Sequence, residues 1–225
     1  MERRAVSEQV CWGCGAGTTG RIFCEVCQRI QPFPEHADYF SVLGLSRCMQ
    51  IDPGDLEKRF HALSRRFHPD FFQNKSERER EISLSNSAAL NRAYRTLRDP
   101  ASRGAYLVSL VEGGSGQIPL KAPADLFEEI LELQETLQEY RALQGTRPER
   151  EALGEKLVSV RADLQHRDQE FLQGLEKVFS QWDDLPEAHR EAERGLVQTV
   201  KDLLSQRAYI GRVIHDIEQA LGREG

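Results

Sequence analysis

Apolar residues recur at helical spacing along most of the chain. In the first half, four apolar side chains follow one another at spacings of four, three and four residues, which predicts one buried helical stripe. These residues are Leu56, Phe60, Leu63 and Phe67. Asp52 and Pro53 suit the N-cap and the first position of this helix, and Pro69 ends it because its ring disfavours helical geometry in the preceding residue. A longer helix is predicted at about 77–98 and a short one at about 102–111.

The second half of the chain carries three longer amphipathic stripes. The first contains Leu126, Ile130, Leu133 and Leu137, the second runs from Leu153 to Trp182, and the third runs from Leu196 to Leu221. Turn-forming residues at 145–148 and 183–186 separate the stripes, so an antiparallel three-helix bundle is expected. The Gly-rich segment 112–119 has the composition of a flexible linker. We therefore predict an all-α fold with a module at 1–34, a helical domain at 35–111, this linker, and a bundle at 120–225.

Residues 1–34 hold too few apolar side chains to form a core, but they carry two C-x-x-C pairs. The pairs, Cys11 with Cys14 and Cys24 with Cys27, are separated by nine residues. Such pairs are typical ligands of a four-thiolate zinc knuckle, so one structural zinc ion is predicted, and the module would need it to fold. The alternatives are iron in a rubredoxin-like site and a redox dithiol pair, although thioredoxin-type chemistry would need a βαβ context that the pattern lacks.

Composition and charge narrow the choice of partner. The 225 residues carry a formal net charge of −6 with both signs interspersed, which gives no reason to expect nucleic-acid binding. No apolar run approaches the roughly 18–20 residues that a membrane span requires. No secretory or convincing mitochondrial leader is recognisable before the first cysteine. We therefore expect neither a nucleic acid nor a membrane among the partners.

The tripeptide His68-Pro69-Asp70 falls between two predicted helices and follows a basic helical surface. The basic side chains, opposite the apolar stripe or on its flank, belong to Lys58, Arg59, Arg65 and Arg66. Such charges are most simply an ordinary solvated face, but beside the loop motif they are expected to dock an acidic partner. No further catalytic group, nucleophile or phosphate-binding loop accompanies the tripeptide, so we do not expect an enzyme.

Residues 36–111 resemble a J domain, the DnaJ-type module, in their helix pattern, in the tripeptide and in the segments at 91–97 and 99–103. The resemblance implies that the two long helices form an antiparallel pair with His68, Pro69 and Asp70 in the exposed loop between them. It further implies that this loop stimulates ATP hydrolysis by a heat-shock protein 70-class chaperone, on which the basic helix docks.

The chain as a whole resembles the HscB family of iron–sulfur cluster co-chaperones. It has Phe71-Phe72 after the tripeptide, an acidic helical bundle and no Gly/Phe-rich stretch, and animal and plant members of the family share the two C-x-x-C pairs. The resemblance implies that the first bundle helix binds an IscU-type scaffold protein. The residues that align with the family's scaffold-binding positions are Phe127, Leu131, Glu132 and Glu135. Phe127 and Leu131 point roughly 100–140° away from the core stripe, so they either form an exposed patch or pack against another part of the protein.

The function that this resemblance implies is delivery of the scaffold to the chaperone for cluster transfer, in the mitochondrial matrix or alternatively in the cytoplasm. Three competing hypotheses remain: a metal-regulated adaptor that works without a chaperone, a redox sensor, and a general folding co-chaperone. A homodimer is one option for the oligomeric state.

Overall fold

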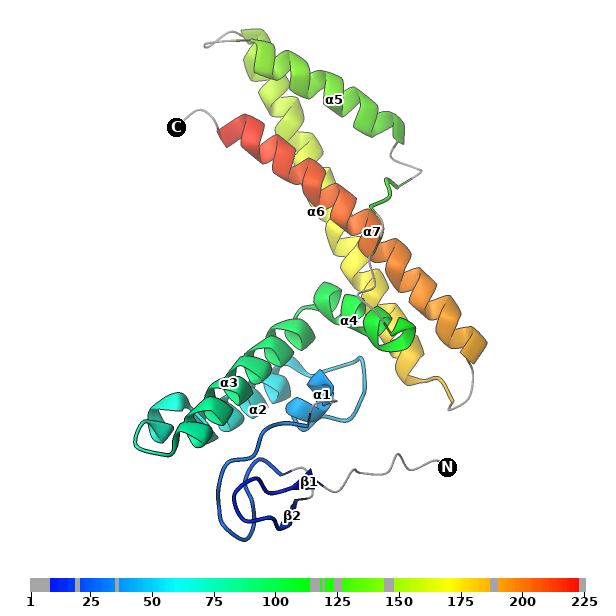
Figure 1. Ribbon diagram of the computed structural model, residues 1–225. Coiled ribbons are helices and arrows are strands. Elements are labelled where there is room, and N and C mark those ends of the chain that lie inside the picture. Colours follow the sequence, from blue (N-terminus) through cyan, green and yellow to red (C-terminus); the bar gives the residue numbers. More distant parts are fainter. Residues whose placement is uncertain are drawn as a thin grey trace. The chain divides into compact units, whose positions relative to one another are not determined.

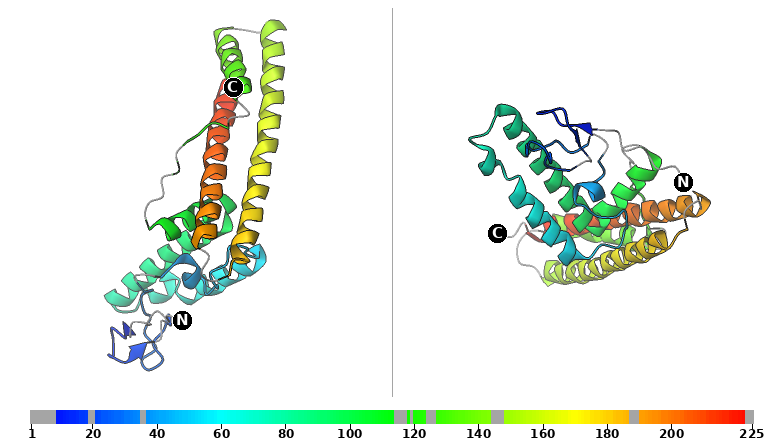
Figure 2. Two further views of the ribbon diagram at one scale, coloured as in Figure 1. Left: turned by 90° about the vertical axis from the view of Figure 1, so that its right-hand side faces the viewer. Right: turned by 90° about the horizontal axis from the view of Figure 1, so that it is seen from below.

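The computed structural model of the protein describes residues 9–18, 21–34, 37–113, 118, 120–123, 127–143, 148–186 and 190–222. The chain divides into two compact units, and the boundary in the sequence falls between Ser102 and Arg103. Helices make up nearly all of the regular structure in these residues (Figure 1, Figure 2). The all-α fold class predicted from the periodicity is confirmed.

The first unit begins with a small module of short strands and turns. Strand β1 (Gln9–Val10) pairs antiparallel with strand β2 (Gly17–Thr18), and an isolated bridge joins Phe23 to Ile30. Within the described part of this module, Ile30 is the only buried aliphatic side chain. Such a small apolar interior agrees with a fold that depends on a metal rather than on a hydrophobic core.

Helices α2 and α3 form the body of the first unit. Its helical elements are α1 (Tyr39–Val42), α2 (Pro53–Arg66), the 3₁₀ turn η1 (Pro69–Phe72) and α3 (Glu77–Arg98). The side chain of Asp52 caps α2, and Pro53 occupies its first position. Ser76 and Glu79 form a capping box at the start of α3. The helix boundaries therefore follow from local sequence signals; the one at Asp52 and Pro53 was predicted, whereas the capping box was not singled out.

The packing of α2 on α3 places the two helices in opposite directions (Figure 1). The rings of Phe60 and Tyr94 stack with their centroids 4.2 Å apart and an interplanar angle of 17°. Nearer the loop, the Ser83 hydroxyl of α3 donates a 2.8 Å hydrogen bond to the carbonyl of Phe67. The largest fully buried side chains of this helical part include Phe40, Leu43, Met49, Leu56, Phe67, Leu90 and Leu97.

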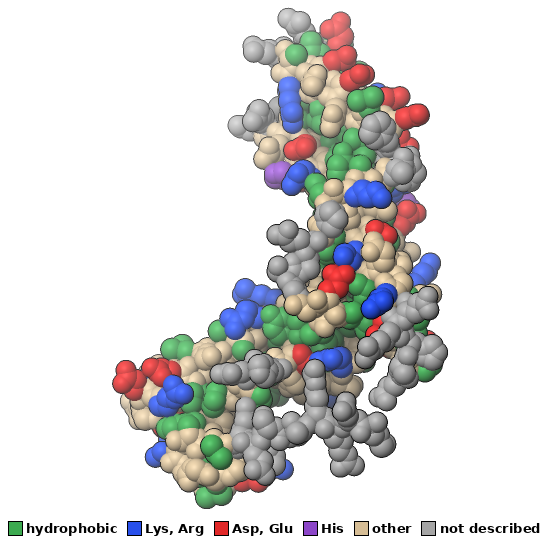
Figure 3. Space-filling model, turned by 45° about the vertical axis from the view of Figure 1, so that its right-hand side comes forward, with side chains coloured by type: hydrophobic (Ala, Val, Ile, Leu, Met, Phe, Trp, Pro, Cys, Tyr) green, Lys and Arg blue, Asp and Glu red, His purple; other side chains and the backbone are tan. Residues whose placement is uncertain are grey.

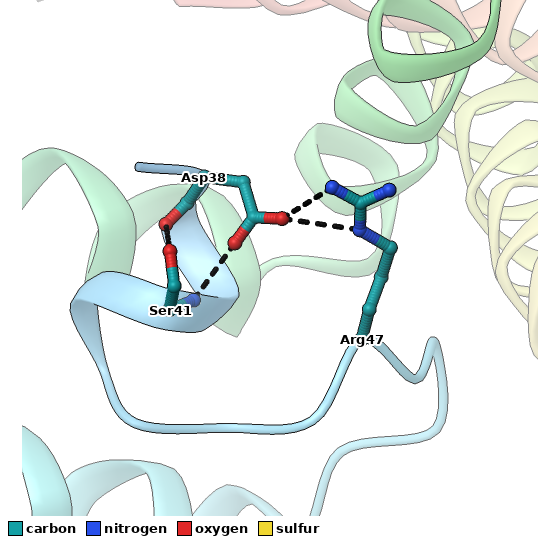
Figure 4. Close-up of polar contacts among 3 residues, drawn as sticks. All are labelled: Asp38, Ser41 and Arg47. Carbon is teal, nitrogen blue, oxygen red and sulfur yellow. Dashed lines mark hydrogen bonds and ion pairs between the residues drawn. The ribbon is translucent and has the colours of Figure 1, made fainter. Parts of the chain in front are cut away.

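Asp38 ties the start of α1 to the loop that follows it (Figure 4). Its carboxylate accepts a 2.8 Å hydrogen bond from the Ser41 N–H and a second from the Arg47 guanidinium, whose Nε lies 3.1 Å away. Burial raises the pKa of Asp38, but these donors and the positive charge of Arg47 outweigh it and hold the pKa below its usual value. A four-residue helix cannot persist alone, so this cap contributes to its presence.

The second unit is built on two long helices, α6 and α7, which lie side by side (Figure 2). Its helices are α4 (Pro100–Glu112), α5 (Phe127–Ala142), α6 (Pro148–Asp183) and α7 (Arg190–Leu221). Helix α5 covers one half of the α6–α7 pair and completes the predicted three-helix bundle. The buried side chains there include Ile130, Leu133, Leu137, Leu157, Leu164, Ile210 and Ile217.

Helix α4 packs on the other half of the α6–α7 pair. A Cβ atom on Gly104 would lie 3.2 Å from Val200 Cγ1 and 3.6 Å from Leu175 Cδ2, so the absence of a side chain permits a close helix approach. The buried Arg103 guanidinium lies 5.0 Å from the centre of the Phe179 ring, and Lys201 pairs with Glu112 at 3.0 Å. Residues 103–111 therefore group with the second unit, whereas the sequence-based division placed them in the domain at 35–111.

Other parts of the sequence-based prediction fall outside the described residues. Leu126, the first member of the α5 stripe, is one of them, and of the linker only Glu112, Gly113 and Ile118 are described. Among the helices that the structure describes, none combines the length and apolar character that crossing a membrane requires.

Candidate functional site

The tripeptide forms an exposed turn between α2 and α3. Asp70 lies beside His68, whose Nδ1 is 3.4 Å from the Asp70 backbone nitrogen and 3.4 Å from its Oδ2. The Phe71 N–H donates to the His68 carbonyl at 3.0 Å and closes the turn. Half of the His68 side chain and 70% of the Asp70 side chain are exposed. The imidazole and the carboxylate are thus presented together to a partner.

Buried aromatic residues hold both ends of this turn. Phe67 and Phe72 are buried, whereas Phe71 between them is 67% exposed. The carbonyl of Phe67 accepts hydrogen bonds from the hydroxyls of Ser83 at 2.8 Å and Ser87 at 3.4 Å. Because both flanks are anchored, the exposed residues have a defined backbone rather than a free loop.

The four basic residues predicted for chaperone docking all lie on α2, but they differ in their contacts. Lys58 and Arg65 are exposed. Arg59 pairs with Asp55 at 2.7 Å and donates to the Gly44 carbonyl at 2.7 Å. The guanidinium of Arg66 lies 5.3 Å from the centre of the Phe23 ring in the N-terminal module. Their role in docking stays a prediction; Arg66 is exposed like Lys58 and Arg65, whereas Arg59 is half-buried.

The predicted scaffold-binding residues lie on α5. Leu131 is 54% exposed, and Glu132 and Glu135 are exposed as well. Acidic side chains gather on the surface that α5 occupies (Figure 3), where Glu128 is also exposed. The side chain of Phe127, at the start of α5, lies outside the described residues. An apolar residue with an acidic border is therefore present at Leu131, as expected if this face binds a partner.

The four cysteines come together as predicted. Their Sγ atoms all lie within 4.8 Å of one another, with 3.5 Å between Cys11 and Cys27 and 3.7 Å between Cys14 and Cys24. A regular tetrahedron of thiolates around zinc, with Zn–S bonds of about 2.3 Å, has edges of about 3.8 Å. The donor set and its spacing therefore fit one tetrahedral metal ion.

The two cysteine pairs sit in turns of the same design. The N–H of Gly15 donates to the Cys11 carbonyl at 2.9 Å, and the N–H of Gln28 donates to the Cys24 carbonyl at 2.9 Å. Both donors have a positive φ, 72° for Gly15 and 58° for Gln28. Each turn bends the chain back so that both thiols of a pair face the same point. The second turn places a glutamine where the first has the glycine that suits this conformation.

The thiols affect one another's ionisation. Burial raises the pKa of Cys11, but hydrogen bonds from the N–H groups of Gly13 and Cys14 and from neighbouring thiols lower it to about 6. The N–H of Ala16 lowers the pKa of Cys14, but desolvation and the other three thiols raise it to about 12. A divalent cation among the sulfur atoms would stabilise the thiolate form of Cys14, whose proton the neighbouring thiols otherwise retain.

Two buried polar residues that the sequence analysis did not single out join the module to α3. Gln31 donates from Nε2 to Cys11 Sγ at 3.3 Å, and Asn86 donates from Nδ2 to the Gln31 carbonyl at 2.9 Å. Ser83 and Asn86 precede Leu90, Ala93 and Leu97 on the buried face of α3. The position of Ser83 and Asn86 on this apolar face could have identified them in the sequence, because a buried polar side chain there must find a hydrogen-bond partner.

Comparison with known proteins places these features in a family. A model of the DnaJ domain matches residues 38–106, which include α2, the exposed turn and α3. A mouse protein named iron-sulfur cluster co-chaperone protein HscB is 30% identical over 214 residues, which cover 92% of this chain and 81% of the mouse protein. The chain belongs to the HscB co-chaperone family.

Human HscB gives the same result at the level of sequence and of structure. The human protein is 33% identical over 186 residues, which cover 79% of this chain and 73% of that protein. The crystal structure of human co-chaperone protein HscB superimposes with a TM-score of 0.65 at 28% identity and covers 94% of this chain and 98% of the human chain. The J-domain and HscB resemblance inferred from the motifs is confirmed.

Proposed function

We propose that this HscB family member is a co-chaperone of iron–sulfur cluster assembly that stimulates the ATPase of a heat-shock protein 70-class chaperone and delivers an IscU-type scaffold to it. The observation that carries the proposal is the exposed turn with adjacent His68 and Asp70, backed by the exposed basic residues Lys58 and Arg65. A second, separate surface at Leu131 on α5 supports binding of another protein.

In this mechanism the chain works by holding two partners at once. The exposed part of α2 binds the acidic surface of the chaperone, and His68 with Asp70 contacts the groups that control hydrolysis. The α5 surface holds the scaffold, so the chaperone meets it at a raised effective concentration. Hydrolysis then closes the chaperone on the scaffold and favours transfer of the cluster, which is cargo and not a cofactor of this chain.

For the cysteine cluster we propose one structural zinc ion held by Cys11, Cys14, Cys24 and Cys27. The ion would neutralise the thiolates and fix the two turns, and its four protein ligands would leave no open position for chemistry. Elemental analysis of the purified protein distinguishes zinc from iron, which is the alternative occupant.

The decisive measurement is the steady-state ATPase rate of a mitochondrial heat-shock protein 70-class chaperone with the protein, with and without scaffold. Stimulation that rises further with scaffold is the expected result. Asp70→Asn should abolish stimulation and keep scaffold binding, whereas Leu131→Ala should weaken scaffold binding and keep basal stimulation. The matched controls are Asp163→Asn and Leu84→Ala, which change exposed residues of the same types.

Two other results of the ATPase assay would each support one of the competing functions. Stimulation that is indifferent to scaffold would indicate a general folding co-chaperone, and no stimulation would indicate the metal-regulated adaptor.

We propose the mitochondrial matrix as the compartment because the resemblance is to the animal and plant form. Imaging of the tagged protein tests this against the cytoplasm, and light scattering tests for a homodimer.

A further inference from the structure

One turn of α3 holds both the N-terminal module and the start of the exposed loop. Ser83 and Ser87 donate to the carbonyl of Phe67, the residue directly before His68. Asn86, between them, faces the module instead and is only 1% exposed. Loop and module are therefore bound to the same few residues of one helix.

The contact of Asn86 with the module uses both ends of its amide. Nδ2 donates to the Gln31 carbonyl at 2.9 Å, and Oδ1 accepts from the Phe33 N–H at 3.1 Å. This paired arrangement fixes the backbone segment that follows the second cysteine pair in both position and direction. It is a buried, charge-free clamp, in which loss of one partner leaves the other polar group unsatisfied.

The clamped segment also touches the loop directly. The Phe33 ring packs edge-on against Phe67, with ring centroids 5.9 Å apart and an interplanar angle of 86°. On the other side, Phe23 of the module lies under the guanidinium of Arg66. The last two residues before His68 thus each contact a phenylalanine of the module.

The same segment leads back to the cysteines. Gln31 is buried, and its Nε2 donates to Cys11 Sγ at 3.3 Å and to the Arg29 carbonyl at 2.9 Å. Trp12, inside the first pair, donates from Nε1 to the Ile30 carbonyl at 2.7 Å. An ordered cysteine cluster therefore orders residues 29–33, the residues that Asn86 and Phe67 contact.

We propose that Asn86 and Phe33 are positioning residues for the loop around His68, through which the metal-loaded cysteine module sets the loop's order and hence the stimulation of the chaperone's ATPase. The module is then part of the chaperone-activating machinery as well as a fold element. The ATPase half of this inference rests on the proposed function, but the structural half, coupling between module and loop, does not.

The test uses the full-length, zinc-loaded protein and hydrogen–deuterium exchange of the Phe71 amide, which donates to the His68 carbonyl inside the loop. Asn86→Ala and Phe33→Ala are each expected to speed this exchange about fivefold, the effect of about one lost hydrogen bond or ring contact. Ser85→Ala, which changes the exposed polar neighbour of Asn86 on the same helix, is the matched control and should leave the exchange rate unchanged. Removing the metal with a chelator should speed exchange in the wild type and add little in Asn86→Ala.

The functional readout separates positioning from general stability. Both variants should lower the maximal ATPase stimulation about fivefold and leave scaffold affinity, which depends on α5, unchanged. Should Asn86→Ala fold poorly, as its melting curve would show, Phe33→Ala carries the test because it leaves no buried polar group unpaired. Unchanged Phe71 exchange in a folded variant whose residues 21–33 have become fast-exchanging would overturn the proposal. A wild type that fails to stimulate the chaperone would refute the proposed function and leave the exchange result standing.

Discussion

The close approach of α4 to α7 at Gly104 allows a quantitative test of the second unit. A methyl group there would meet Val200 Cγ1 at 3.2 Å, Leu204 Cδ1 at 3.5 Å and Leu175 Cδ2 at 3.6 Å. Alanine in place of glycine within a helix stabilises it by about 1 kcal/mol. Overpacking a well-filled site costs about 1–3 kcal/mol. Gly104→Ala should therefore destabilise the unit by about 1 kcal/mol in spite of its better helix propensity.

A second substitution should relieve that crowding. Val200 is fully buried, so Val200→Ala alone should cost about 2 kcal/mol for lost burial and the cavity left behind. In the double variant the new methyl group enters the space that the valine vacates. The double variant should thus lose about 1–2 kcal/mol less than the sum of the single variants.

The assay is urea unfolding followed by Trp182 fluorescence in a Trp12→Phe background, because these are the two tryptophans of the chain and only Trp182 belongs to the second unit. Gly195→Ala on α7 is the matched control. A Cβ at that position would meet nothing within 4 Å, so the variant should be more stable by about 1 kcal/mol. Single-variant effects that add within about 0.5 kcal/mol would refute the packing of α4 on Val200.

Three further predictions concern the first unit. Asp38→Asn should lower the free energy of unfolding at pH 7. The difference from the wild type should shrink on acidification, because a carboxylate with a lowered pKa stabilises the fold above its ordinary pKa of 3.8 and loses this effect as the pH falls below that value; a series of urea unfolding curves from pH 7 downward measures the trend, and a difference that does not change with pH would contradict it. Ser76→Ala should lower the free energy of unfolding by about 1 kcal/mol, because it removes the capping box of α3. Thermal unfolding measures the change, and an effect near zero would contradict the role of the cap. Zinc binding at pH 8 should release protons, including that of Cys14, whose pKa is raised. Titration calorimetry in buffers of different ionisation enthalpy measures this release, because the observed binding enthalpy then varies with the buffer. A binding enthalpy that is independent of the buffer would exclude thiol deprotonation.

The helices were predictable because their signals are local. Asp52 and Pro53 mark the start of α2, and Pro69 follows shortly after its last residue, Arg66. The predicted helix at 77–98 matches α3. The cysteine cluster was equally predictable, since two C-x-x-C pairs in a segment without a core leave few other arrangements.

What the sequence did not reveal depends on contacts between distant residues. The assignment of α4 to the second unit depends on Gly104 fitting against Val200, which periodicity cannot show. The link from the module to the loop depends on Asn86 reaching Gln31, a pair separated by 55 residues. Arg66, predicted as part of the basic docking surface, also lies 5.3 Å from the Phe23 ring of the module, a contact that the helical pattern alone cannot show.

The four cysteines of the cluster differ in their exposure to solvent, so the cluster has one accessible side and one shielded side. Cys11 and Cys24, one from each pair, are buried, whereas Cys14 is exposed and Cys27 is half-buried. A competing chelator or an oxidant therefore reaches the cluster through Cys14 first. If a metal ion is bound, Cys11 and Cys24 would be its shielded ligands and Cys14 the ligand most open to displacement by a competitor. The exchange rate of the metal, unlike its affinity, should then depend more on the exposed Cys14 than on the half-buried Cys27.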